Sequence, residues 1–177
     1  MGGWASFQEK QEEERAMGVF FAKEILEAGV QIETRGHAFY QAMAQKAQSE
    51  SARKLFLELA RDEKDHLRSL EELLPHMMDP PDTWEREEFG MYLAELAESH
   101  VFGKEEGWKK SQEALETDIQ ALDLGIRFEK DSVLFMEALS QMARPQEKAV
   151  VDKLIQWEKE HLLKLVRAKW QLLGRAR

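Results

Sequence analysis

Two short stretches of the chain each place a glutamate three residues before a histidine. The first reads D-E-K-D-H and contains Glu63 and His66, and the second reads W-E-K-E-H and contains Glu158 and His161. Because residues three apart share one face of a helix, each pair directs a carboxylate and an imidazole at a common point. This spacing suits metal ligands, and the alternative is a pair of solvated helix faces.

The sequence around these pairs is also repeated. V-Q-I-E-T-R-G-H-A-F-Y aligns with L-G-I-R-F-E-K-D-S-V-L-F-M when Glu33 is placed on Glu129, which gives a repeat of about 96 residues. Under this alignment Glu33 precedes Glu63 by 30 residues, and Glu129 precedes Glu158 by 29. Each half of the chain therefore offers one isolated glutamate and one Glu-x-x-His pair.

Apolar residues recur at three- and four-residue steps along four long segments, which predicts four amphipathic helices. These segments are approximately residues 17–48, 49–75, 111–144 and 145–173. Between the second and the third, residues 75–108 contain a short apolar helix at about 84–102 and are too long for a tight turn. We therefore predict an all-α four-helix bundle, residues 18–173, made of two helix hairpins joined by this crossover. Residues 1–17 form an N-terminal arm in this interpretation.

The predicted hairpin turns lie near Gln48 and Arg144. Because each helical residue rises about 1.5 Å, Glu33 and Glu63 both lie about 22 Å from their shared turn and so at one height. The second hairpin repeats this arrangement. If all four helix faces turn inward, four glutamates and two histidines meet at one level of the bundle.

Composition supports a helical protein and excludes several kinds of site. Of 177 residues, 43% are hydrophobic and 33% charged, with only ten glycines and four prolines, which favours long helices with few turns. The chain has no cysteine, so any metal site uses Glu, Asp and His. A net charge of -9 argues against nucleic acid as a partner.

The same analysis predicts where the protein is found. No apolar run approaches the roughly 20 residues of a membrane span, and the acidic N-terminal sequence does not resemble a signal peptide. We therefore expect a cytoplasmic protein without a membrane partner. The tryptophans and methionines occur at helical spacings, and we interpret them as core or dimer contacts.

Four carboxylates at one level require positive charge. Two carboxylates about 4 Å apart repel by roughly 4 kcal/mol at an effective dielectric constant near 20. Two divalent ions balance four carboxylates and two neutral imidazoles. Ligands of this kind suit iron or manganese better than zinc or copper. We expect two iron ions, with manganese or a mixed iron–manganese pair as the alternative.

The six-residue set resembles the ferritin-like superfamily, and specifically its rubrerythrin-like branch, over about residues 18–173. The resemblance implies that Glu63 and Glu158 are bridging carboxylates and that Glu33 and Glu129 are terminal ones. It also implies that His66 and His161 supply one imidazole to each iron. Tyr40 matches a tyrosine that such proteins carry beside the site.

The chain departs from the rubrerythrin pattern in two respects. Rubrerythrins usually have a further glutamate three residues after the isolated glutamate of the third helix, where this chain has Ser132. We therefore expect no ligand exchange when the site is oxidised. Rubrerythrins also usually carry a rubredoxin domain, and a chain without cysteine would take its electrons from another protein.

Two neighbouring side chains have plainer interpretations. Tyr40 is either a second-shell or electron-transfer residue, or a core aromatic whose hydroxyl is hydrogen-bonded. His37 lies one turn after Glu33, and we expect it to pack or to act in the second shell, and not to be a seventh ligand.

We consider three functions. The first is a di-iron oxidoreductase that reduces peroxide or dioxygen with electrons from an external donor protein, in a homodimer. The second is a ferroxidase, an iron-handling or iron-storage protein, and the serine at position 132 slightly favours this function. The third is a non-catalytic helical interaction module that uses metal only for stability.

Overall fold

The computed structural model describes residues 29–73, 92, 95–96, 113–142 and 145–174. Within these residues the regular structure is helical and contains no strand, which confirms the all-α prediction. The long helices are residues 29–46, α2 (Glu50–Leu73), α5 (Asp118–Met142) and α6 (Pro145–Leu172). The predicted N-terminal arm, residues 17–28 of the first predicted helix, and the crossover at 75–108 apart from residues 92, 95 and 96 lie outside the described residues.

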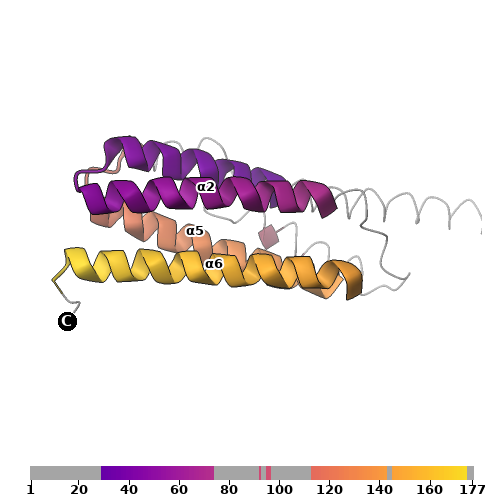
Figure 1. Ribbon diagram of the computed structural model, residues 1–177. Helices are drawn as coiled ribbons and strands as arrows, with labels where there is room; N and C mark the ends of the chain where they lie inside the picture. The colour runs from indigo at the N-terminus through magenta and orange to yellow at the C-terminus, as the bar shows by residue number, and fades with distance from the viewer. Residues whose placement is uncertain (1–28, 74–91, 93–94, 97–112, 143–144, 175–177) are drawn as a thin grey trace, which may run out of the picture.

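The helices form a four-helix bundle of two hairpins (Figure 1). Residues 29–46 and α2 make one antiparallel hairpin, and α5 and α6 make the other. Two ion pairs connect α6 to α5. They join Lys159 to Glu137, at 2.8 Å, and Lys169 to Asp123. Helix α5 begins at the end of the bundle opposite to the end of α2, so these two helices run parallel.

The helix starts follow from capping side chains. The hydroxyl of Ser49 accepts a hydrogen bond from the backbone N–H of Ala52 at 3.2 Å, as an N-cap does for α2. Helix α5 begins at Asp118, later than the start near residue 111 that the sequence predicted. The reason is a capping box: Thr117 Oγ1 accepts the N–H of Gln120 at 3.3 Å, and the Gln120 side chain accepts the N–H of Thr117 at 3.1 Å.

The turn of the first hairpin is attached to the start of α5. The Asp118 carboxylate is 7% exposed and accepts hydrogen bonds from the backbone N–H groups of Gln48 and Ser49, both at 2.9 Å. It also accepts the Ser49 hydroxyl at 2.7 Å. Because one carboxylate binds both segments, the first hairpin is held in register with the second.

Aromatic and aliphatic side chains fill the centre of the bundle. The largest fully buried ones come from residues 29–46, α2 and α5 and include Phe39, Phe56, Phe128 and Phe135, and α6 adds the smaller Leu154. Gly36 permits one close contact, because a Cβ at this position would overlap the ring of Phe128. The helix of residues 29–46 therefore approaches α5 closely beside the level of the predicted site.

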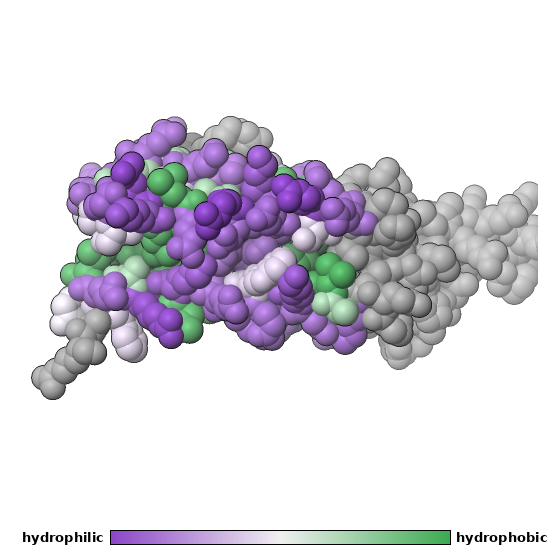
Figure 2. Space-filling model, viewed as in Figure 1, coloured by the Kyte–Doolittle hydropathy of each residue, from purple (hydrophilic) through white to green (hydrophobic). Residues whose placement is uncertain are grey.

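The outer face over α2 and α6 is mostly hydrophilic, with separate hydrophobic patches (Figure 2). None of the described helices is both long enough and apolar enough to cross a lipid bilayer.

Candidate metal centre

The six predicted residues lie together inside the bundle, and each is at most 2% exposed. Two isolated glutamates come from the first hairpin helix and from α5, and the two Glu-x-x-His pairs come from α2 and α6. The residues are Glu33, Glu63, His66, Glu129, Glu158 and His161. The apolar stripes of the four helices face one another, so polar residues at the same level of those stripes are carried inward together.

His66 faces three of the carboxylates. Its Nδ1 atom is 2.6 Å from Glu158 Oε1, 3.6 Å from Glu63 Oε2 and 3.7 Å from Glu33 Oε2. The second histidine lies beside it, because the ring centroids of His66 and His161 are 5.0 Å apart with an angle of 19° between the ring planes.

His161 faces a complementary set. Its Nδ1 atom is 3.4 Å from Glu63 Oε1, 3.7 Å from Glu129 Oε1 and 3.8 Å from Glu158 Oε2. Glu63 and Glu158 thus face both histidines. In this set of contacts Glu129 approaches only His161, and Glu33 approaches only His66.

The buried polar atoms of this cluster lack hydrogen-bond partners. Both carboxylate oxygens of Glu33, Glu63 and Glu158 have none among the described residues, and neither does Nδ1 of either histidine. One side-chain atom from each of four residues, the two Glu-x-x-His pairs, lies within 4.8 Å of the others. Buried polar atoms without partners are costly. Oxygen and nitrogen atoms that converge in this way fit divalent cations, because a cation satisfies several of them at once.

The pKa values of the cluster reflect the cost of burying several carboxylates close together. Burial and the nearby Glu158 carboxylate raise the pKa of Glu63 and of Glu129 well above the ordinary carboxyl value. Burial would also raise the pKa of Glu158, but the imidazole of His66 lowers it to about 2. Burial acts to lower the pKa of His66, but the carboxylates of Glu158, Glu33 and Glu63 outweigh it and raise this pKa. For His161, burial dominates and lowers the pKa. Without cations, burial together with the neighbouring carboxylate therefore favours the protonated forms of Glu63 and Glu129.

Tyr40 is fully buried and contacts this cluster. Its hydroxyl donates a hydrogen bond to Glu129 Oε1. Burial, followed by the negative charge of Glu129, raises the pKa of Tyr40 well above its ordinary value. The phenol therefore keeps its proton and holds one oxygen of Glu129 in place. Gly125 leaves room for it, since a Cβ there would lie 3.3 Å from the hydroxyl oxygen.

Two other residues singled out by the sequence each lie one turn after a cluster glutamate. Nδ1 of His37 hydrogen-bonds the backbone carbonyl of Ala60, so this nitrogen carries the proton. Ser132 is fully buried on α5, one turn after Glu129.

Two residues that the motif spacing did not indicate as functional contact the histidines. Asp62 Oδ2 lies 3.4 Å from His161 Nε2. The ring of Trp157 stacks on His66, with 5.1 Å between ring centroids and 4° between ring planes. Both residues directly precede a site glutamate, so the repeated motif included them. Their partners lie on the opposite hairpin, which no local spacing reveals.

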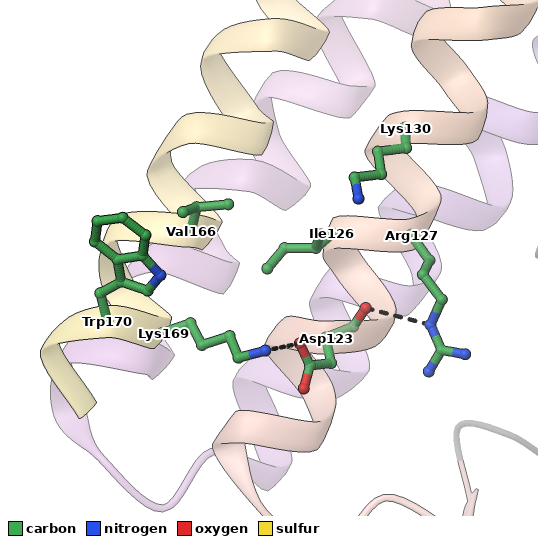
Figure 3. A pocket seen from close by; sticks show the side chains of 7 residues that line it. All are labelled: Asp123, Ile126, Arg127, Lys130, Val166, Lys169 and Trp170. Carbon is green, nitrogen blue, oxygen red and sulfur yellow. Dashed lines mark hydrogen bonds and ion pairs between the residues drawn. The ribbon is translucent and has the colours of Figure 1, made fainter. Parts of the chain in front are cut away.

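A separate hollow lies on the outer surface between α5 and α6 (Figure 3). This groove has a volume of about 460 Å³. Its lining is rich in basic side chains and is formed by Asp123, Ile126, Arg127, Lys130, Val166, Lys169 and Trp170. None of the six clustered residues lines it, so it is a surface feature distinct from the buried cluster.

Comparison with known proteins agrees with this arrangement. No curated protein and no solved structure matches the chain. The family model described as Rubrerythrin matches residues 24–169, which include both helix hairpins and all six clustered residues. The chain therefore belongs to the rubrerythrin family.

Proposed function

We propose that this protein is a di-iron oxidoreductase that reduces peroxide or dioxygen with electrons from an external donor protein. The observation that carries the proposal is the buried set of four carboxylates and two imidazoles, most of whose polar atoms face one another without a hydrogen-bond partner among the described residues. Such a set is stable when cations neutralise it, and membership of the rubrerythrin family favours iron.

The contacts support a division of the ligands between two ions. Glu63 and Glu158 face both histidines and would bridge the ions. Glu33 with His66 would complete one position, since their atoms lie 3.7 Å apart. The other position would use Glu129 of α5 and His161 of α6.

Two ferrous ions, when bound, supply the two electrons that reduce one peroxide molecule to water. The protein's part is to keep the ligand geometry constant while the charge of the centre changes. The Tyr40 hydroxyl orients Glu129 through its hydrogen bond to Oε1. The apolar side chains around the cluster exclude bulk water, which strengthens each charge interaction inside it.

A ferroxidase or iron-handling protein is the second candidate, and Ser132 favours it. This side chain is fully buried one turn after Glu129, where a typical rubrerythrin supplies a carboxylate. A hydroxyl is a shorter and weaker ligand than a carboxylate. We therefore expect the histidines to remain bound in both oxidation states, and the preference for peroxide over dioxygen to be weaker than in a typical rubrerythrin.

The test begins with metal analysis of protein produced with iron available, followed by anaerobic titration of the ferrous protein with peroxide. We expect two irons per chain and oxidation by about one equivalent of peroxide. Iron-loaded protein that transfers no electrons to peroxide or dioxygen would contradict the oxidoreductase proposal. Solution mass then separates the candidates, because storage requires a large hollow assembly and our proposal requires only a homodimer.

Ser132→Glu distinguishes the two candidates directly. If a carboxylate at this position promotes the reaction with peroxide, stopped-flow absorbance should show a higher ratio of the peroxide rate to the dioxygen rate than in the unmodified protein. Ser132→Gln, which has the same size without the charge, is the matched control. An unchanged ratio with full metal content would mean that Ser132 does not determine the oxidant.

A further inference from the structure

The two sides of the buried cluster differ in the residue behind each histidine. Asp62 and Trp157 occupy equivalent positions in the sequence repeat, directly before Glu63 and Glu158. Asp62 contacts His161, and Trp157 stacks on the histidine of the first hairpin. An approximately repeated sequence has therefore produced two chemically different environments.

The environment of His161 is negatively charged and polar. Its Nδ1 atom faces the carboxylates, and its Nε2 atom lies 3.4 Å from Asp62 Oδ2. The same Asp62 oxygen lies 3.2 Å from Lys164 Nζ, which is also 2.6 Å from Glu58 Oε1. A carboxylate beside Nε2 favours the tautomer with the hydrogen on that nitrogen. The Nδ1 lone pair is then directed at the centre of the cluster.

This arrangement is the one that strengthens a metal-binding histidine. A carboxylate that accepts the outer N–H of such a histidine orients the ring and increases the basicity of the ligating nitrogen. Losing that partner typically reduces metal affinity by about 10- to 100-fold. Asp62 also adds a negative charge near the site, and its 25% exposed side chain is partly shielded from water.

Among the described residues, no carboxylate pairs with Nε2 of His66 as Asp62 does with Nε2 of His161. The indole of Trp157 orients the imidazole by stacking, but its nitrogen is a donor only and cannot accept the histidine proton. The ammonium of Lys153 lies 4.5 Å from the centroid of the same indole. The described ring that stacks on this histidine is therefore uncharged, and the cation recorded beside that ring does not attract a second cation.

We propose that the two metal positions have unequal affinities, and that the position served by His161 binds its ion first and more tightly. This inference rests on the proposed metal binding by the six residues. It adds that Asp62 is the positioning residue that makes one position stronger, and that Trp157 leaves the other weaker. When metal is scarce, the protein then carries a single ion beside His161 and Glu129.

The direct test locates the first ion. Purified full-length protein, freed of metal with a chelator, is given one equivalent of Mn(II) and crystallised, and anomalous diffraction locates the manganese. We expect density beside His161 at one equivalent and at both positions with excess Mn(II). In solution, the electron paramagnetic resonance spectrum should show isolated Mn(II) first, and a coupled pair only after the second equivalent.

Two substitutions test the cause. Asp62→Asn keeps the size of the side chain and removes its charge, so we expect the affinity for the first Mn(II) to fall by about 10- to 100-fold. The control is Asp65→Asn on the same helix, which makes the same change of charge on a side chain that is 56% exposed and pairs with Arg68.

Three results would overturn the inference: a first ion beside His66, two ions bound with equal affinity, or equal losses in Asp62→Asn and Asp65→Asn. Each of these leaves the proposed di-metal centre in place, since Mn(II) still binds. A protein with all six residues intact that binds no Mn(II) and no Fe(II) would overturn the inference and the proposed function together.

Discussion

A buried cluster of carboxylates and an exposed groove rich in basic side chains meet at adjacent residues of α5, and the two regions differ in how their charges are compensated. Glu129 is fully buried in the acidic cluster, whereas its neighbour Lys130 is exposed and lines the basic groove between α5 and α6 (Figure 3). Water screens the groove, so its cations can remain near one another at little cost. Little water reaches the cluster, so its carboxylates must bind cations or retain protons. Several like charges close together therefore indicate a bound ligand only where they are buried, as in the carboxylate cluster.

The largest effect should follow from removing a carboxylate that faces both histidines. Glu63→Ala or Glu158→Ala should remove most of the bound metal, because each would serve both ions. His37→Ala should leave at least one ion per chain, since this side chain bonds a backbone carbonyl outside the cluster. Metal content is measured after dialysis against a weak chelator. Equal metal content in all three variants would contradict the ligand assignment.

Removing metal should destabilise the fold strongly, because the buried carboxylates then lose their counter-charge. Binding to the native state alone contributes about 2.7 kcal/mol when free metal is at a hundredfold excess over its dissociation constant. Thermal unfolding of chelated and iron-loaded samples measures the difference. If both samples unfold at the same temperature with occupancy verified, the six residues do not form a buried metal site.

The pH should affect the stability of the chelated protein in a predictable direction. The pKa of His66 is raised above the ordinary imidazole value of 6.5, and the pKa values of Glu63 and Glu129 are raised above the ordinary carboxyl value of 4.5, so the folded protein keeps protons at pH values where the unfolded chain has released them. Stability should therefore fall as pH rises from 7 to 9, by about 1.4 kcal/mol per pH unit for each such proton. The depressed pKa of Glu158, about 2, acts only in acid, where stability falls as pH falls.

Metal-loaded protein provides the control for this pH dependence. Its carboxylates are already deprotonated, so metal binding should strengthen as pH rises from acid to neutral, and the fall between pH 7 and 9 should disappear. Denaturant titration at each pH gives both free energies of unfolding. A chelated protein whose stability rises from pH 7 to 9 would contradict the protonation of the buried cluster.

The smallest effect should come from the groove. Lys130→Ala should change the free energy of unfolding by no more than about 0.5 kcal/mol and leave the metal content unchanged, because the side chain is exposed and screened. Glu129→Ala, one residue away, is the matched comparison and should reduce metal content. Similar effects from both substitutions would show that burial does not separate the two groups of charge.

Much of the fold could be predicted because helix formation depends on local periodicity. The apolar spacing predicted the four described helices, and α6 begins at Pro145, where the sequence predicted the break between the third and fourth helices. The start of α5 was predicted too early, because the apolar pattern continues through Leu115, outside the helix. The capping box of Thr117 and Gln120 sets the start of the helix, and the sequence contains it as T-x-x-Q.

The six buried residues illustrate what a sequence can and cannot specify. Their types, their i,i+3 spacing and their common height in two hairpins are properties of the chain itself, because a helix converts sequence separation into a direction and a distance. The contacts of Asp62 with His161 and of Trp157 with His66 depend on how one hairpin faces the other. That packing is determined by side chains from all four helices at once, so the inequivalence of the two sides became visible only in the folded bundle.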